Sequence, residues 1–274
     1  MELAHTPESG AARQRSISRR LGARGVAEIA VSAFSALALL AAWELLVRAR
    51  ILDHRFFPAP SEVLTTLVQM VISGQLLSDV AITLTRVGIG FAAGSAVGIV
   101  VGLLMGLSRV VRAAVRPIVG AVYPIPKIAI LPLVMLIFGL GETSRYVIVA
   151  IGVFFLVLLN TMAGVMGIER IYLDVGRNFG ASRLNVLRTI ALPGALPLIF
   201  TGLRLGWGTA LLLIVAAEFV GARSGLGYLI WNSWQTFSVD EMYAGLLVIS
   251  ALGLISFALF DQLERRLVPW RGDR

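Results

Sequence analysis

Three ionisable side chains, Lys127, Arg204 and Glu218, lie inside apolar runs of this chain, where they could act on a charged solute. A charge near the centre of a bilayer costs about 3 kcal/mol on insertion scales, so such a side chain points into the protein or into a water-filled space. Lys127 is the only lysine, and it is either a structural cation held by backbone carbonyls or a group that attracts an anionic solute along a path. For Arg204 and Glu218 an ion pair or a helix-end position is the simpler interpretation, and Asn160 is expected to bridge two helices.

The chain lacks the residue sets of common catalytic and metal sites. It has no cysteine, which excludes disulfides and thiolate ligands, and its two histidines, His5 and His54, fall in a polar tail and a loop. A phosphate-binding P-loop needs a glycine-rich turn that ends in Gly-Lys-Ser/Thr, but Lys127 stands between Pro126 and Ile128. No Ser/His/Asp set or paired-carboxylate site is apparent. We therefore expect no enzyme activity and no metal or cofactor bound by this chain, so a pump built on it must take its energy from another subunit.

The composition predicts an integral membrane protein. Of 274 residues, 57% are hydrophobic and 15% are charged, and the mean hydropathy is +0.85. A soluble domain has an apolar share nearer one half and a charged share of about a quarter. The net charge of +8 would suggest nucleic acid in a soluble protein, but arginines beside apolar spans usually record membrane orientation. We therefore expect the chain to contact membrane lipids and to have no nucleic-acid partner.

Six apolar runs predict six membrane-spanning helices and an all-α fold. The first run is close to the roughly 20 residues that a bilayer requires, whereas a removable signal peptide, the alternative, has a shorter apolar core. The predicted spans are 26–47, 80–107, 117–140, 146–167, 196–220 and 243–263. They leave a disordered basic arm at 1–25, the first span at 26–47, an external segment at 53–79, a membrane core at 80–265 and a tail at 266–274.

The arginines predict that both termini are cytoplasmic. Basic residues concentrate on the cytoplasmic side of membrane proteins. A predicted loop carries Arg109, Arg112 and Arg116, whereas the external segment mixes basic residues with acidic ones such as Glu62 and Asp79. The arm and the tail are also rich in arginine, which places them on the same side as that loop.

The external segment predicts one amphipathic helix. Ser61 can accept a backbone N–H at its start and so cap it. Val63, Leu67 and Val71 then fall on one side, as in a helix that rests on the outer membrane surface.

A ridge of glycines runs along the second span. Gly90, Gly94, Gly98, Gly102 and Gly106 recur every four residues and leave one side of the helix shallow. Close backbone approach drives helices together in a bilayer, because lipid tails are as apolar as leucine. The ridge therefore predicts tight packing against another span, with a pore-lining role as the alternative.

The third span is predicted to be broken. Pro124, Pro126 and Pro132 each remove a helical hydrogen bond and clash with the preceding turn. Freed backbone at membrane depth is tolerated only inside protein or along a watery cavity, so this span is expected to face a dimer interior or a transport path. The candidate residues of a translocation path are Pro124, Pro126, Lys127, Asn160, Arg204 and Glu218.

A polar stretch between the fourth and fifth spans, residues 169–193, predicts two short helices at the cytoplasmic membrane face. Asp174 falls in the first turn of the first helix, where a carboxylate favours the helix dipole. Gly180 supplies the left-handed conformation that ends this helix. Ser182 can cap the second helix, and Pro193 is expected to end it. On physical grounds alone, the stretch is either a plain connection or a docking site for a soluble partner.

The spacing within this stretch resembles the EAA loop of ABC importer permeases. There a carboxylate and two small residues precede a glycine, and Ile-x-Leu-Pro follows ten residues after it. Asp174, Gly180 and Ile190-x-Leu192-Pro193 match this order, although Asp replaces Glu and Val175-Gly176 replaces Ala-Ala. The resemblance implies that an ATPase subunit docks on Asp174, Val175, Gly176, Arg177, Asn178, Phe179, Gly180, Ala181, Ser182, Arg183 and Leu184.

Further segments resemble the nitrate/sulfonate/taurine subgroup of these permeases, and the likeness extends over about 57–266. They are Phe57-Pro-Ala-Pro-Ser-Glu-Val63, Thr83-Leu-Thr-Arg86, Pro124-Ile-Pro-Lys127, Phe138-Gly-Leu-Gly-Glu142, Ala217-Glu218 and Gly225-Leu-Gly227. The resemblance implies a six-helix permease of the type I ABC importer fold in a bacterial inner membrane.

The same resemblance implies a mechanism and its partners. Two copies of the permease would form the path, two ATPase subunits would bind ATP and Mg and dock on the loop, and an extracytoplasmic solute-binding protein would deliver a small solute, expected to be anionic (sulfonate, taurine, nitrate or similar). An ion-gradient-driven secondary transporter and a membrane scaffold without transport are the alternatives. A secondary transporter is expected to show broken helices in two matching halves, and only the third span fits that pattern.

Overall fold

The computed structural model describes residue 31 and residues 34–270. The basic arm predicted at 1–25 lies outside them. The described residues form helices, turns and loops without a strand, which confirms the all-α prediction. The chain divides into two compact units, 1–65 and 66–274.

In the first unit, the start of helix α2 (Pro60–Ile72) is stabilised in a way that the sequence did not predict. Ser61 lies inside the helix and does not cap it: its hydroxyl donates to a Glu44 carboxylate oxygen at 2.8 Å. The Glu62 carboxylate instead reaches back to the Ala59 N–H at 3.0 Å. The expected cap at Ser61 is therefore wrong, because the helix already begins at Pro60.

Four helices in the described part of the chain are long and apolar enough to cross a membrane, and a bent helix pair can form a fifth span. The predicted first span lies partly outside the described residues, and its residues 34–48 are helical. The spanning helices are α3 (Gln75–Leu107), α6 (Glu142–Met166), the helix that runs from Arg183 to Phe219, and α11 (Val239–Leu267).

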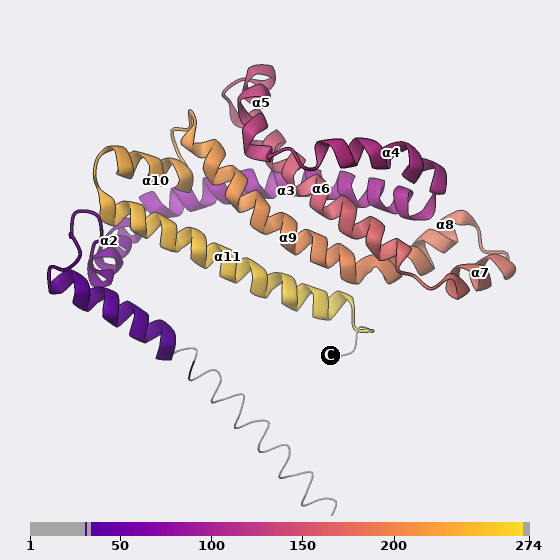
Figure 1. Ribbon diagram of the computed structural model, residues 1–274, viewed down its shortest axis with the longest axis horizontal. Coiled ribbons are helices and arrows are strands. Elements are labelled where there is room, and N and C mark those ends of the chain that lie inside the picture. The colour runs from indigo at the N-terminus through magenta and orange to yellow at the C-terminus, as the bar shows by residue number, and fades with distance from the viewer. Residues whose placement is uncertain (1–30, 32–33, 271–274) are drawn as a thin grey trace, which may run out of the picture. The chain divides into compact units, whose positions relative to one another are not determined.

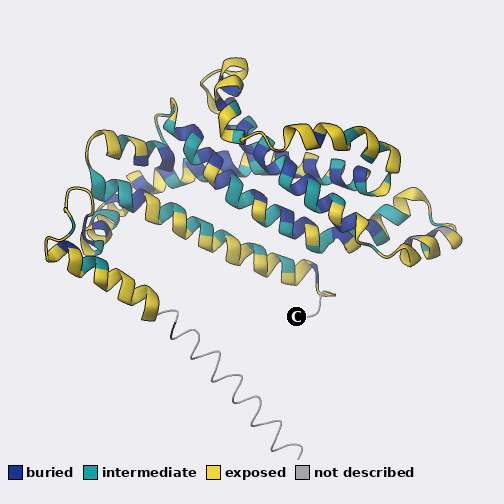
Figure 2. Ribbon diagram, in the orientation of Figure 1, coloured by how far each residue is buried: buried dark blue, intermediate teal, exposed yellow. Residues whose placement is uncertain are grey.

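The core of the second unit forms where α3, α6 and α9 (Leu192–Phe219) pack together (Figure 1). Figure 2 shows that buried residues are concentrated on these three helices. The centre of the core is apolar and includes Val87 of α3, Val153 of α6 and Ile214 of α9, all fully buried.

The glycine ridge of α3 packs against α6, as predicted. A Cβ added at Gly102 would lie 2.6 Å from the Cβ of Thr161, and one at Gly90 would lie 2.7 Å from the Cβ of Val149. Real Cβ atoms do not approach this closely, so the two backbones meet only because these side chains are absent. Small residues allow this close packing between membrane helices.

The proline-rich span is broken, as predicted, but its first half begins earlier than expected. α4 (Arg109–Val122) is followed by a 3-10 turn, η1 (Lys127–Ile130), and by α5 (Leu131–Phe138). The two halves meet at 85°.

The three arginines predicted to lie in a loop therefore belong to α4, and that prediction is wrong. Ser108 caps α4 by accepting the Val111 N–H at 3.3 Å, so the chain turns directly from α3 into the next helix. Arg112 donates to the carbonyl oxygens of Met105 and Gly106 at 2.8 and 2.9 Å. These are carbonyls of the last turn of α3, which a basic side chain stabilises.

A short helix that was not predicted, α10 (Leu226–Gln235), lies between α9 and α11. It follows a turn at the end of α9 that contains Gly221 and Gly225, both with positive φ angles of 69° and 107°. Figure 1 shows α10 at one end of α9, and the chain leading into α7 and α8 at the other end.

Candidate functional site

The predicted docking loop consists of two helices joined at Gly180. These are α7 (Arg170–Asn178) and α8 (Arg183–Val186). Gly180 has φ +75°, and a Cβ added there would meet no atom within 4 Å, so glycine is required by the backbone conformation and not by packing. Ser182 caps α8 by accepting the Asn185 N–H at 3.2 Å. Both predicted roles are confirmed.

Two other predictions for this loop are wrong. Asp174 is the fifth residue of α7 and not part of its first turn, because the helix begins at Arg170. Pro193 does not end a helix: it lies in the first turn of α9, where its missing N–H costs little. A π-helical turn, η2 (Leu187–Ala191), joins α8 to α9, so the docking loop continues directly into a membrane-spanning helix.

The loop exposes large apolar side chains. Phe179, in the turn after α7, is 87% exposed, and Val175 is 48% exposed. Soluble surfaces rarely carry such a cluster unless a partner covers it. The exposed large apolar residues of the loop are Ile171, Tyr172, Val175, Phe179 and Leu184.

The remaining predicted docking residues are arranged around this surface. Asp174, Asn178, Ser182 and Arg183 are exposed, and Ala181 is half-buried. The side chain of Arg177 lies outside the described part of the chain.

Gly176 faces the helical turn that joins α8 to α9. A Cβ there would lie 2.8 Å from Cδ1 of Ile190. The small residue at this position therefore lets α7 lie close to the helical turn that leads into α9.

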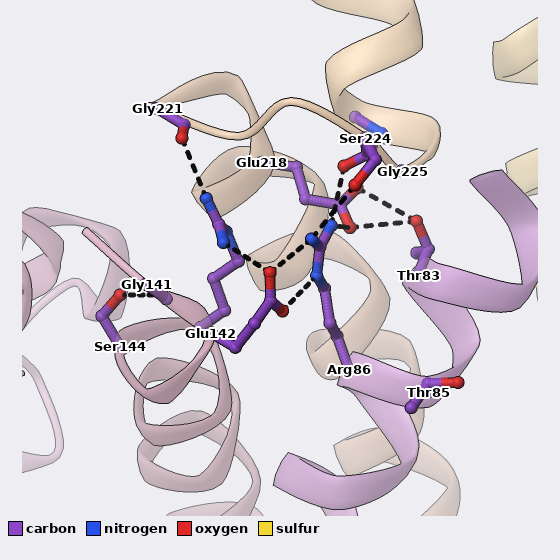
Figure 3. A network of polar contacts seen from close by, with 12 residues as sticks. Thr83, Thr85, Arg86, Gly141, Glu142, Ser144, Glu218, Gly221, Ser224 and Gly225 are labelled. Atoms are coloured by element: carbon purple, nitrogen blue, oxygen red, sulfur yellow. Dashed lines mark hydrogen bonds and ion pairs between the residues drawn. The ribbon is translucent and has the colours of Figure 1, made fainter. Parts of the chain in front are cut away.

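A buried polar network lies at the other end of the long helices (Figure 3). Its centre is Arg86 of α3, which is 4% exposed. Its guanidinium donates to both carboxylate oxygens of Glu142 at 2.6 Å, to Glu218 at 2.7 Å and to the backbone carbonyl of Ser224 at 2.7 Å. One side chain thus joins α3 to the start of α6, the end of α9 and the turn before α10.

Carboxylates hold the start of α10 in the same network. Glu218, 1% exposed, accepts the Gly227 N–H at 2.8 Å, and Asp79 accepts the Gly225 N–H at 2.7 Å. The Thr83 hydroxyl accepts the Leu226 N–H at 2.8 Å and donates to Glu218. Three N–H groups at the beginning of α10, which have no partner within the helix, are satisfied in this way.

Sequence reasoning missed this network as a unit. Asp79 was predicted to lie in the external segment before the second span; the structure places it in α3, which begins at Gln75, and buries its carboxylate against the turn before α10. The expectation of an ion pair for Glu218 is confirmed. The available signal was the set of polar segments around Arg86, Glu142 and Gly225, but only the tertiary structure shows that they meet.

The candidate path residues do not form one site. Pro124, Pro126 and Lys127 gather at the break after α4. Arg204 pairs with Asp261 at 2.5 Å and with Glu264 at 2.8 Å, which links α9 to α11.

Asn160 lies elsewhere on α6. Its amide donates to the Leu156 carbonyl of the same helix at 2.8 Å. A Cβ at Gly202 would lie 2.9 Å from the Asn160 Cβ, so the residue packs against α9 without the predicted hydrogen-bonded bridge in the structure.

Together, the helical arrangement, the broken span and the exposed loop define the fold of type I ABC importer permeases. A chain of the inward-facing MetNI methionine ABC transporter is similar with a TM-score of 0.63 at 21% identity, covering 72% of this chain and 97% of that one. A chain of an amino acid ABC transporter gives a TM-score of 0.56 at 16% identity, covering 74% and 97%.

The chain belongs to the family of binding-protein-dependent transport system inner membrane components, whose sequence profile matches residues 94–269. It is 34% identical to the taurine transport system permease protein TauC of Escherichia coli (strain K12), covering 86% of this chain and 87% of that protein. It is also 34% identical to SsuC of the same organism, named for aliphatic sulfonate transport, covering 86% and 90%. The chain is therefore a transport permease, and the secondary-transporter alternative has no support among these relatives.

Proposed function

We propose that this chain imports small sulfonates such as taurine as the permease subunit of an ABC importer. Two copies form the path across the inner membrane with both termini in the cytoplasm, and an extracytoplasmic binding protein delivers the solute. Two separate ATPase subunits hold ATP and Mg and dock on residues 169–193. The observation that carries the substrate class is the 34% identity with TauC over 86% of the chain.

The loop has the surface and the rigidity that docking requires. Phe179 and Val175 offer apolar area to a partner, and the Gly180 bend presents it away from the membrane helices. α8 runs through η2 into α9 without a break. α9 has 28 residues and so extends about 42 Å at 1.5 Å per residue.

This continuity supplies a route for coupling. A displacement of α8 by the ATPase is carried along α9 to Glu218, near its other end, where the helix is bonded to α3, α10 and, through Arg86, α6. ATP binding to the docked ATPase subunits can then move the outer ends of the helices. Alternating access follows from such a lever without any chemistry by the permease itself.

The docking part is tested with Phe179→Asp. Burying a large apolar side chain contributes about 1.5–3 kcal/mol, so we expect at least about tenfold weaker binding of the ATPase subunit. The side chain is almost fully exposed, and membrane yield is expected to stay normal. Phe237→Asp is the matched control, because Phe237 is 82% exposed but lies beyond α10. Equal ATPase affinity in both variants would contradict the docking site.

The substrate part is tested by uptake into proteoliposomes that contain the permease, its ATPase and its binding protein. We expect ATP-dependent accumulation of taurine or a short alkanesulfonate. Uptake without ATP, driven by an imposed ion gradient, would refute the ABC mechanism. ATP-dependent uptake of a different solute, with none of any sulfonate, would refute the substrate class alone.

A further inference from the structure

We propose that the Lys127 ammonium is a transient binding site for the sulfonate group of the solute as it crosses the membrane. This inference rests on the proposed function for the identity of the anion, whereas the site itself is argued from the charge and position of Lys127.

Lys127 lies at the depth of the membrane centre. Its ammonium is 4.5 Å from the ring centroid of Phe155 and 5.6 Å from that of Tyr123. Phe155 is the fourteenth of the 25 residues of α6, which is a helix long and apolar enough to span the membrane. A cation next to the middle residue of a spanning helix is close to the middle of the bilayer.

The hydrogen-bond partners of the ammonium are all neutral. It donates to the backbone carbonyls of Val122, Tyr123 and Ile125 at 3.1, 2.8 and 2.8 Å. Pro126 has no N–H to offer the Val122 carbonyl four residues earlier, so the break itself supplies an acceptor. Within the described residues, no carboxylate lies within ion-pair distance of Lys127.

Three arginines inside α3, α6 and α9 are compensated differently. Arg86, Arg145 and Arg204 each pair with a carboxylate at 2.5–2.8 Å. Lys127 is thus a membrane-depth cation whose charge is not balanced by an anion of the described protein. Intramembrane cations of this kind normally face a water-filled cavity or a substrate pathway.

The position is also open to a solute. Lys127 is half-buried, and its neighbours Tyr123 and Ile125 are 44% and 43% exposed. A sulfonate has three acceptor oxygens and a full negative charge, so it can replace the carbonyls as partner of the ammonium in a charge-assisted hydrogen bond. Neutral carbonyls take the ammonium back when the anion leaves, which suits a site that must bind and release during each cycle.

The first test compares Lys127→Met with Lys127→Arg in the reconstituted complex. Methionine keeps a similar length and removes the charge; arginine keeps the charge. We expect sulfonate uptake to fall at least about tenfold in Lys127→Met and at most about twofold in Lys127→Arg, because one charge-assisted contact is worth about a factor of ten or more. ATP hydrolysis stimulated by the loaded binding protein is expected to stay within about twofold in both variants, because neither touches the docking loop.

Uptake by Lys127→Met within about twofold of the unchanged protein would overturn the proposal. So would an equal loss of uptake and of stimulated hydrolysis in both variants, because that pattern indicates a structural role at the break.

A second test does not depend on whether a variant folds. Because Lys127 is the only lysine of the chain, an amine-specific reagent such as methyl acetimidate marks one side chain of the intact permease, read by peptide mass spectrometry in the full complex. We expect millimolar ethanesulfonate to slow its modification at least about fivefold, and ethylammonium, of similar size, to leave the rate unchanged. No modification in any nucleotide state would overturn the site, and so would equal rates with both in a complex that takes up sulfonates.

The proposed substrate and the proposed anion site at Lys127 can be refuted independently of each other. If the unchanged complex takes up no sulfonate, the proposed substrate is wrong, and the same protection measurement is made with nitrate and bicarbonate. Protection by either of these anions retains Lys127 as an anion site, whereas protection by none overturns it.

Discussion

Replacing Arg86 by methionine should cost far more stability than replacing its exposed partner. Arg86 is 4% exposed and Glu218 is 1% exposed, so the variant leaves a carboxylate buried with only Thr83 and the Gly227 N–H as partners. Removing one partner of a buried ion pair costs about 3–5 kcal/mol. In Glu142→Gln, by contrast, Arg86 keeps Glu218, the amide oxygen can still accept a hydrogen bond from Arg145, and the Glu142 side chain is 46% exposed, so the expected cost is about 2 kcal/mol or less.

The difference is measured by detergent-titrated unfolding of the purified permease, followed by near-ultraviolet circular dichroism. Hydrogen exchange adds a local measurement, because the Leu226 and Gly227 N–H groups are bonded to Thr83 and Glu218 and should exchange faster in Arg86→Met. Adding Glu218→Gln to Arg86→Met removes the uncompensated charge and should recover about half of the loss. Losses for Arg86→Met and Glu142→Gln that agree within about 1 kcal/mol, or no recovery in the double variant, would refute the reasoning.

Two further substitutions test the glycines. Gly102→Val forces atoms into Thr161, whose Cβ would lie 2.6 Å from the new Cβ, and should cost about 1–3 kcal/mol of stability in the same unfolding assay. Gly88→Ala is the control, because a Cβ at this position of the same helix meets nothing within 4 Å and should not destabilise the protein. Equal losses of stability in the two variants would contradict the packing of α3 on α6. Gly180→Asp should abolish ATPase docking or coupling while membrane insertion stays intact, because φ is +75° at the bend and a bulky charge enters the proposed docking surface. Normal co-purification of the ATPase together with normal stimulated hydrolysis would contradict this prediction.

Periodic and strongly local features of the fold were predictable. The glycines of α3 recur every four residues, and this spacing has one physical consequence, close backbone packing against another helix. In the structure that helix is α6. Pro124 and Pro126 break their span because proline lacks a backbone N–H, and Gly180 ends α7 because its φ is positive. Each of these depends on a few neighbouring residues, so the sequence alone is sufficient.

Features that depend on where a helix begins, or on distant partners, were not predictable. Hydropathy marks the apolar middle of a helix, so it placed Asp79 ahead of its helix and three arginines of α4 in a loop, although both helices extend into polar sequence. The polar network joins Thr83, Glu142 and Gly225 across 142 residues of chain. In the sequence they are three separate residues, and only helix packing brings them into one hydrogen-bond network.

The Arg86 network and the Lys127 site differ in what they can do during transport. At Arg86, positive and negative groups satisfy one another, and their separation leaves a buried charge without a partner. This network therefore favours keeping the beginnings of α3 and α6 and the end of α9 together. At Lys127, the described residues hold the charge with neutral groups, the carbonyls of the break and the rings of Tyr123 and Phe155, so it can exchange partners at lower cost. We therefore expect the helices to move around Arg86 as a unit when α8 is displaced, while the solute interacts with the broken span. The loop at 169–193 would then act on the position of Lys127 through the packing of α6 against α9, without touching the solute.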